Sequence, residues 1–103
     1  MPSGTPVANL NTFTVRLVTL VTPGTPVQGP DVTVPHGYAV VVRMRRHAGS
    51  PLGYVADSSA NASGADRSVL RDNDAILLYV TNLSAIWVDA DTATTVFELI
   101  VEQ

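Results

Sequence analysis

Two pairs of acidic residues are the first candidates for chemistry in this sequence. Asp72 and Asp74 are separated by one residue, and Asp89 and Asp91 repeat that spacing. Carboxylates so placed in a turn can offer oxygen ligands to Ca²⁺, but neither pair is followed by the further ligands and distal Glu of an EF-hand loop. Asp side chains also bond the backbone of their own turns. We therefore expect no metal and no cofactor, with Ca²⁺ at the Asp89/Asp91 turn as the alternative.

Histidine and serine offer little further chemistry. His36 and His47 are the two histidines, and the sequence has no cysteine, so a zinc site would need carboxylates or a second subunit to complete four ligands. Ser58 or Ser68 could be combined with either histidine, but no Gly-x-Ser-x-Gly elbow accompanies them. There is also no glycine-rich phosphate loop. The sequence thus favours a protein that is not an enzyme.

The chain that would have to position these residues has the size of one domain. It has 103 residues, 46% of them hydrophobic, and a formal net charge of −3. A nucleic-acid-binding protein would normally carry a basic excess, and so would a protein drawn to anionic membranes. No apolar stretch approaches the length of a membrane-spanning helix, and the first residues lack the pattern of a secretory signal. We expect synthesis in a cytoplasm, with neither nucleic acid nor membrane as partner.

Alternation of apolar and polar residues predicts strands along most of the chain. Residues 1–11, rich in proline and small residues, are predicted to be an extended arm, and 12–103 to be a single domain. Residues 57–67 are small and polar and predict a loop with no buried face. The predicted strands are 12–21, 27–28, 32–34, 38–47, 52–56, 68–70, 75–81, 85–88 and 95–102.

This pattern predicts an all-β fold. The segments are short, their spacing is regular, and residues typical of turns separate them. No window shows sustained helical spacing of apolar residues. The expected architecture is an antiparallel β-sandwich or a jelly-roll-like small barrel of about eight short strands.

Two features suggest contacts with other proteins. Arg43, Arg45 and His47 share one face of a predicted strand and would form a positive stripe. That stripe could meet an acidic protein surface, or it could pair with Asp72, Asp74 or a C-terminal Glu of the same chain. Tyr79 and Trp87 lie on strand faces opposite the neighbouring aliphatic residues, which indicates either core packing or a subunit interface.

Three segments resemble a group of small structural proteins of tailed bacteriophages. They are residues 32–43 (VTVPHGYAVVVR), 53–59 (GYVADSS) and 78–91 (LYVTNLSAIWVDAD), of which the last is the most specific. The resemblance covers roughly residues 12 to 102. Two turns depart from the group's pattern: residues 70–74 read LRDND instead of Leu-x-Pro-Gly-Glu, and Ala56 replaces a glycine.

The resemblance implies a protein of the virion, of the capsid-decoration or head-accessory type. Such a protein would bind the major capsid protein on the exterior of the particle and stabilise the shell by protein–protein contacts. We also expect self-association into a homotrimer or another small homo-oligomer. The residues expected to make contacts are Val7 and Leu10 in the arm, Arg43, Arg45 and Trp87.

A carbohydrate-binding or receptor-binding module of a tail fibre or scaffold is the alternative function. Sandwiches commonly bind sugars on exposed aromatic rings. Aromatic residues make up only 6% of this sequence, and Tyr54, Tyr79 and Trp87 all lie within apolar strands. The composition therefore favours the structural role over the sugar-binding one.

Overall fold

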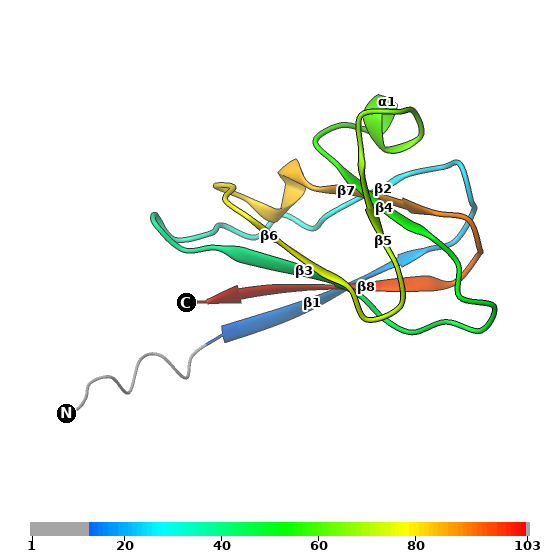
Figure 1. Ribbon diagram of the computed structural model, residues 1–103. Helices are drawn as coiled ribbons and strands as arrows, with labels where there is room; N and C mark the ends of the chain where they lie inside the picture. Colours follow the sequence, from blue (N-terminus) through cyan, green and yellow to red (C-terminus); the bar gives the residue numbers. More distant parts are fainter. Residues whose placement is uncertain (1–12, 103) are drawn as a thin grey trace.

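The computed structural model describes residues 13–102, which form a mostly β structure of two packed antiparallel four-stranded sheets (Figure 1). Sheet A has the strand order β1-β8-β3-β6, and sheet B has the order β2-β7-β4-β5. The two sheets do not close into a barrel, so the predicted β-sandwich is confirmed. The strands are β1 (Phe13–Leu20), β2 (Val27–Gln28), β3 (Val40–Met44), β4 (Gly53–Ala56), β5 (Ser68–Leu70), β6 (Ala75–Leu78), β7 (Trp87–Ala90) and β8 (Thr95–Glu102).

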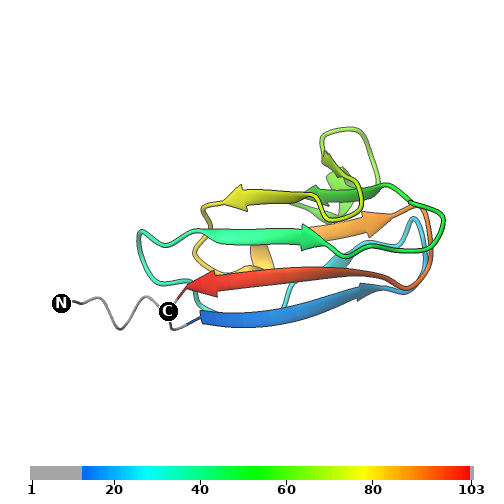
Figure 2. The same cartoon turned by 60° about the horizontal axis from the view of Figure 1, so that its bottom comes forward.

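Sheet A is the longer sheet because β1 and β8 pair over eight residues each, from Phe13 opposite Glu102 to Leu20 opposite Thr95. Seen with the bottom of the molecule brought forward, β1, β8, β3 and β6 lie side by side with no helix in front of them (Figure 2). Strands alternate the direction of their side chains, so each strand of sheet A has one set of residues facing sheet B and one facing away.

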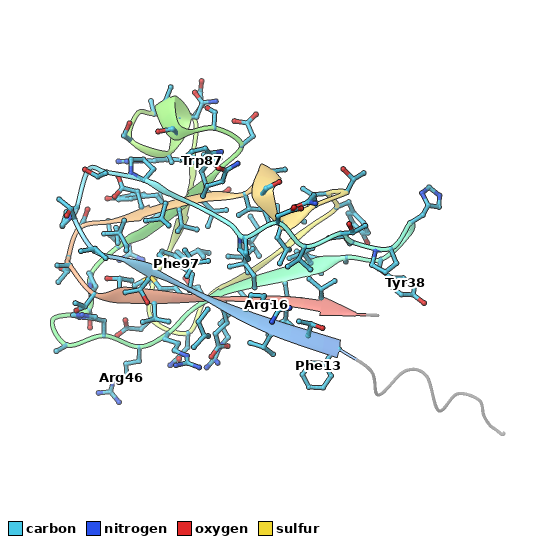
Figure 3. All side chains as sticks on the ribbon, turned by 180° about the vertical axis from the view of Figure 1, so that it is seen from behind. Phe13, Arg16, Tyr38, Arg46, Trp87 and Phe97 are labelled. Atoms are coloured by element: carbon cyan, nitrogen blue, oxygen red, sulfur yellow. The ribbon has the colours of Figure 1, made fainter. Side chains whose placement is uncertain are left out.

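The hydrophobic core lies between the sheets. Alternate residues of β3 and β8 are fully buried there, and Phe97 is the largest of them (Figure 3). Gly53 in β4 leaves room for this ring: a Cβ at that position would lie 2.5 Å from Met44 Sδ and 3.0 Å from the Phe97 ring. The sheets can therefore pack closely at this point only because residue 53 has no side chain.

Residues 57–67 differ from the prediction. They were expected to lack a buried face, but they contain the short helix α1 (Ser59–Ala62), and the Ala62 side chain is fully buried. Ser58 caps the helix, because its Oγ accepts a hydrogen bond from the Asn61 N–H at 3.1 Å. A four-residue helix is too short to show helical periodicity in the sequence, and its one buried group is a methyl. The periodicity signal was therefore missing.

The strand predicted at 85–88 is displaced toward the C-terminus. Leu83–Ala85 form a short 3-10 helix, and β7 follows at Trp87–Ala90. Asn82 caps this helix: its Oδ1 accepts hydrogen bonds from the Ser84 N–H at 2.9 Å and the Val32 N–H at 3.2 Å. Within residues 13–102, no helix is long and apolar enough to cross a membrane.

Candidate functional site

The side of sheet A that faces away from the core is apolar, and we call it the outer A face. It consists of Phe13, Val15, Leu17, Thr19, Val41, Arg43, Ala75, Leu77, Val96, Glu98 and Ile100, the strand residues that alternate with the buried ones. Val15 pairs with Ile100, Ile100 with Val41, and Val41 with Leu77. A continuous row of four aliphatic side chains therefore crosses all four strands.

Much of this surface is open to solvent. Phe13 is 59% exposed, Leu17 53% and Leu77 55%, while Val41 and Ile100 in the middle of the sheet are partly exposed. The solvated side of an antiparallel sheet normally carries polar residues that alternate with the apolar ones of the core. Contiguous exposed apolar patches are uncommon on monomeric proteins and mark interaction sites. The outer A face is therefore the leading candidate for a protein-binding surface.

The charged residues beside this apolar row are bonded to one another. Glu98 accepts hydrogen bonds from Arg45 Nε at 2.6 Å and from Arg43 Nη1 at 3.2 Å, and Arg43 Nη2 also donates to Asn73 Oδ1 at 2.9 Å. The hydrogen bond from Arg45 is the main reason why the pKa of Glu98 is lowered from its ordinary value; burial opposes this effect and Arg43 adds to it. Arg43 and Arg45, the two arginines predicted to make contacts, thus lie together and both pair with Glu98. This agrees with the alternative that the positive stripe pairs with a C-terminal Glu of the same chain.

The corresponding side of sheet B, the outer B face, is covered by the chain itself over β4 and β7, whereas Val69 on the edge strand β5 is 51% exposed. Tyr54 and Asp89 are paired on this face, as are Ala56 and Trp87. Residues 57–67, including α1, pack over β4 and β7 (Figure 1). Trp87 is half-buried on the same side of the molecule as α1, whereas Phe13 points away from the opposite side (Figure 3).

Tyr54 is the centre of this covered face. Its ring is 8% exposed, its hydroxyl donates a hydrogen bond to Asp91 Oδ1 at 2.7 Å, and the Arg67 guanidinium lies 3.5 Å from the ring centroid. Arg67 Nη1 in turn donates to the Ala62 carbonyl at 2.8 Å, which ties the 57–67 segment to the sheet. The hydrogen bond to Asp91, followed by burial, raises the pKa of Tyr54. A ring in this position offers no open face on which a sugar could stack.

Three of the acidic residues that were candidates for Ca²⁺ binding accept hydrogen bonds from backbone N–H groups of turns and strands. The Asp89 carboxylate accepts hydrogen bonds from the Gly24 N–H at 3.0 Å and the Ala90 N–H at 2.8 Å. Asp72 accepts one from the His47 N–H, and Asp74 one from the Arg71 N–H. No group of three potential metal ligands occurs in the part of the chain that the structure describes.

A cleft of about 670 Å³ opens between the edge strands β5 and β6. Its walls are apolar, and its rim carries Asp57, Asn61, Asp66, Arg67 and Ser68. Asn61 Nδ2 donates to Asp57 at 2.8 Å, and Arg67 is bound to Tyr54 and Ala62, so several rim groups already have partners within the chain. No histidine lines this cleft, and no pair of a nucleophile and a base is assembled in it.

The structure locates three of the five residues expected to make contacts. Arg43 and Arg45 lie beside the apolar row of the outer A face, and Trp87 lies on the outer B face. Val7 and Leu10 lie outside the described residues. Val15, Leu77 and Ile100 were not predicted to form a surface, although the signal was present: their strands have apolar residues on both faces.

A scan against protein-family models finds no match, and searches of the curated proteins and of the solved structures find none either.

Proposed function

We propose that this chain is a non-enzymatic structural protein of a bacteriophage particle, which binds the outside of the capsid as a decoration protein and stabilises it by protein–protein contacts. The resemblance of residues 32–43, 53–59 and 78–91 to small phage structural proteins suggests the setting. The outer A face carries the proposal of a role in an assembly, because an exposed apolar sheet surface of this extent marks a protein–protein contact, either with the shell or with another copy of the chain that binds the shell.

The remaining polar groups support a binding role rather than catalysis. The Asp residues of both candidate pairs accept hydrogen bonds from the protein itself, and Glu98 is bonded to two arginines. These bonds stabilise turns and strands, which gives a rigid sandwich. A rigid β-domain with one apolar face suits a protein that adds buried area to a shell, since affinity rises when little ordering is needed on binding.

The test is quantitative mass spectrometry of density-purified phage particles, with the copy number of this protein scaled to that of the major capsid protein. A copy number comparable with that of the major capsid protein would support decoration of the capsid. A small number set by the symmetry of a connector or tail would move the protein to that part of the virion. Absence from purified particles would refute the proposal.

A binding experiment with the purified protein sharpens this test. Capsids that lack the protein are mixed with the full chain and sedimented, and the bound fraction is measured at several protein concentrations. We expect saturable binding and an increase in the temperature at which the capsids rupture, because a ligand that binds only the intact shell stabilises it. Saturable binding without any change in rupture temperature would refute the stabilising role.

A further inference from the structure

We propose that the outer A face is covered by the outer A face of a second copy of this chain, so that two copies form a two-fold dimer packed sheet on sheet. This inference rests on the proposed function in one respect: it names the partner of the surface on which that function depends. The capsid would then be contacted by other parts of the dimer.

The shape of the surface favours a second sheet as the partner. The row of Val15, Ile100, Val41 and Leu77 runs across four strands, so only a surface that follows the twist of the whole sheet can contact all of it. Sheets of the same twist pack face to face about 10 Å apart with their side chains interdigitated. The outer A face of another copy has the same twist, because it belongs to the same fold.

The charges of the surface allow a copy of the same chain as the partner. In a two-fold interface the same patch is present on both sides, so a strongly charged patch would repel itself. Glu98 is bonded to both Arg43 and Arg45, so these three residues leave a single net positive charge on the patch. Nucleic acid or an anionic membrane would require a larger basic excess.

The size of the surface is sufficient for a dimer. Four strands about 4.8 Å apart span on the order of 20 Å once side chains are included, and seven residues of about 3.4 Å along β1 and β8 span about 24 Å, while β3 and β6 are shorter. The accessible area of a layer of side chains exceeds its flat projection. It therefore approaches the roughly 800 Å² that each partner contributes to a standard interface.

Sedimentation velocity of the full chain over a range of concentrations tests the proposal. We expect a reversible monomer–dimer equilibrium, and we expect Leu77→Arg to raise its dissociation constant by about tenfold or more, because each dimer would bury two unpaired charges. The matched control is Val69→Arg: Val69 is 51% exposed, close to the 55% of Leu77, and lies on β5, the corresponding edge strand of sheet B. The control should leave the dissociation constant unchanged.

A second variant and a second measurement cover the case in which Leu77→Arg fails to fold. Leu77→Thr places a β-branched side chain, which suits a strand, at this position and should weaken the dimer several-fold because the apolar side chain is lost. Because the chain has no cysteine, a spin label can be attached at Ala75→Cys on the outer A face or at Val69→Cys. In the dimer the labels at position 75 should be closer together than those at 69, since the two outer B faces are separated by about two further sheet spacings, roughly 20 Å.

The outcomes separate this inference from the proposed function. A chain that is monomeric at all concentrations overturns the dimer, even if the protein is abundant on particles. So does a monomer whose binding to capsids is abolished by Leu77→Arg, because the capsid would then cover this face. A dimer weakened by Leu77→Arg but not by Val69→Arg supports the inference, and it does so even if the protein is absent from particles.

Discussion

The outer faces of the two sheets have different surroundings. On sheet B, Tyr54 and Trp87 lie under residues 57–67, and Arg67 fastens this segment to the Tyr54 ring and to the Ala62 carbonyl. On sheet A, Phe13, Leu17 and Leu77 remain more than half exposed. The chain thus uses eleven residues to cover one apolar face and leaves the other open.

In a small sandwich, the outer face of a strand that is apolar on both sides can be covered in two ways. An insertion between strands covers the face within one chain, and its hydrogen bonds contribute to the stability of the monomer. An uncovered face contributes little to the monomer and becomes useful only when another surface is packed on it. Substitutions on the outer B face should therefore act on folding, and those on the outer A face should act on association.

The largest difference in the free energy of unfolding is expected between substitutions of two aromatic residues on opposite faces. Tyr54→Ala should lower the free energy of unfolding by about 3–5 kcal/mol, because it removes a buried ring, its stacking with Arg67 and its bond to Asp91. Phe13→Ala should change it by less than about 0.5 kcal/mol, because that ring is mostly in water. Urea unfolding at a protein concentration where the wild type is monomeric measures both. Equal losses would contradict the distinction between the faces.

A smaller difference in the free energy of unfolding is expected between substitutions of two arginines, one on each face. Arg67→Ala should cost about 1–2 kcal/mol of unfolding free energy, since the guanidinium both stacks on Tyr54 and donates to Ala62. Arg43→Ala should cost less than about 1 kcal/mol, because its ion pair with Glu98 is at the surface. Thermal unfolding followed by circular dichroism compares the two.

Arg67→Lys serves as a control for the first of these variants. It keeps the charge but removes the planar group that stacks on the ring, so its stability should lie between those of the wild type and Arg67→Ala. A lysine variant as stable as the wild type would show that charge alone, rather than stacking, holds the 57–67 segment in place.

The N-cap of α1 offers a test of how residues 57–67 are held over the outer B face. Ser58→Ala should destabilise the protein by about 1 kcal/mol, because the Asn61 N–H loses its acceptor. Ser59→Ala, at the first residue of the same helix, is the matched control and should have little effect. Hydrogen exchange should show faster exchange of the Asn61 amide in the first variant only. An unchanged Asn61 rate in Ser58→Ala would contradict the assigned cap.

The free energy of unfolding should depend on Glu98 at acid pH and on Tyr54 at alkaline pH. These effects should be smaller than those of the substitutions above. Folding lowers the pKa of Glu98, so its contribution is present above the ordinary glutamate pKa and is lost as the pH falls through the lowered value. Folding raises the pKa of Tyr54, so its contribution is present below the ordinary tyrosine pKa and is lost as the pH rises through the raised value. Each contribution should be under about 1 kcal/mol.

Two conservative variants assign these effects. Glu98→Gln should flatten the acid limb of a plot of unfolding free energy against pH, and Tyr54→Phe should flatten the alkaline limb. Each variant should leave the other limb unchanged, because the two residues lie on opposite outer faces. A Glu98→Gln protein that keeps the full acid dependence would show that other carboxylates cause it.

Most of the strands could be predicted from the sequence, whereas the candidate surface could not. The bounds of β2, β5 and β8 agree with the predicted segments, β4 begins one residue later than predicted, and β1 is one residue shorter at each end. The signal is local, because side chains in a strand alternate with a period of two. The helix at Ser59–Ala62 and the displacement of β7 were missed because each depends on a cap, at Ser58 and Asn82, that fixes only a few residues.

The mostly β class, the sandwich architecture and the strand alternation are thus properties of the sequence itself. Which face of a strand becomes the core was decided only by the tertiary structure. In β1, Phe13, Val15 and Leu17 form the more apolar set, yet Val18 and Leu20 are the buried residues. The reason is that period two creates two faces, and the one that is buried depends on where a distant sheet packs. That choice rests on contacts far apart in the chain, and it leaves an apolar surface on the outside of sheet A.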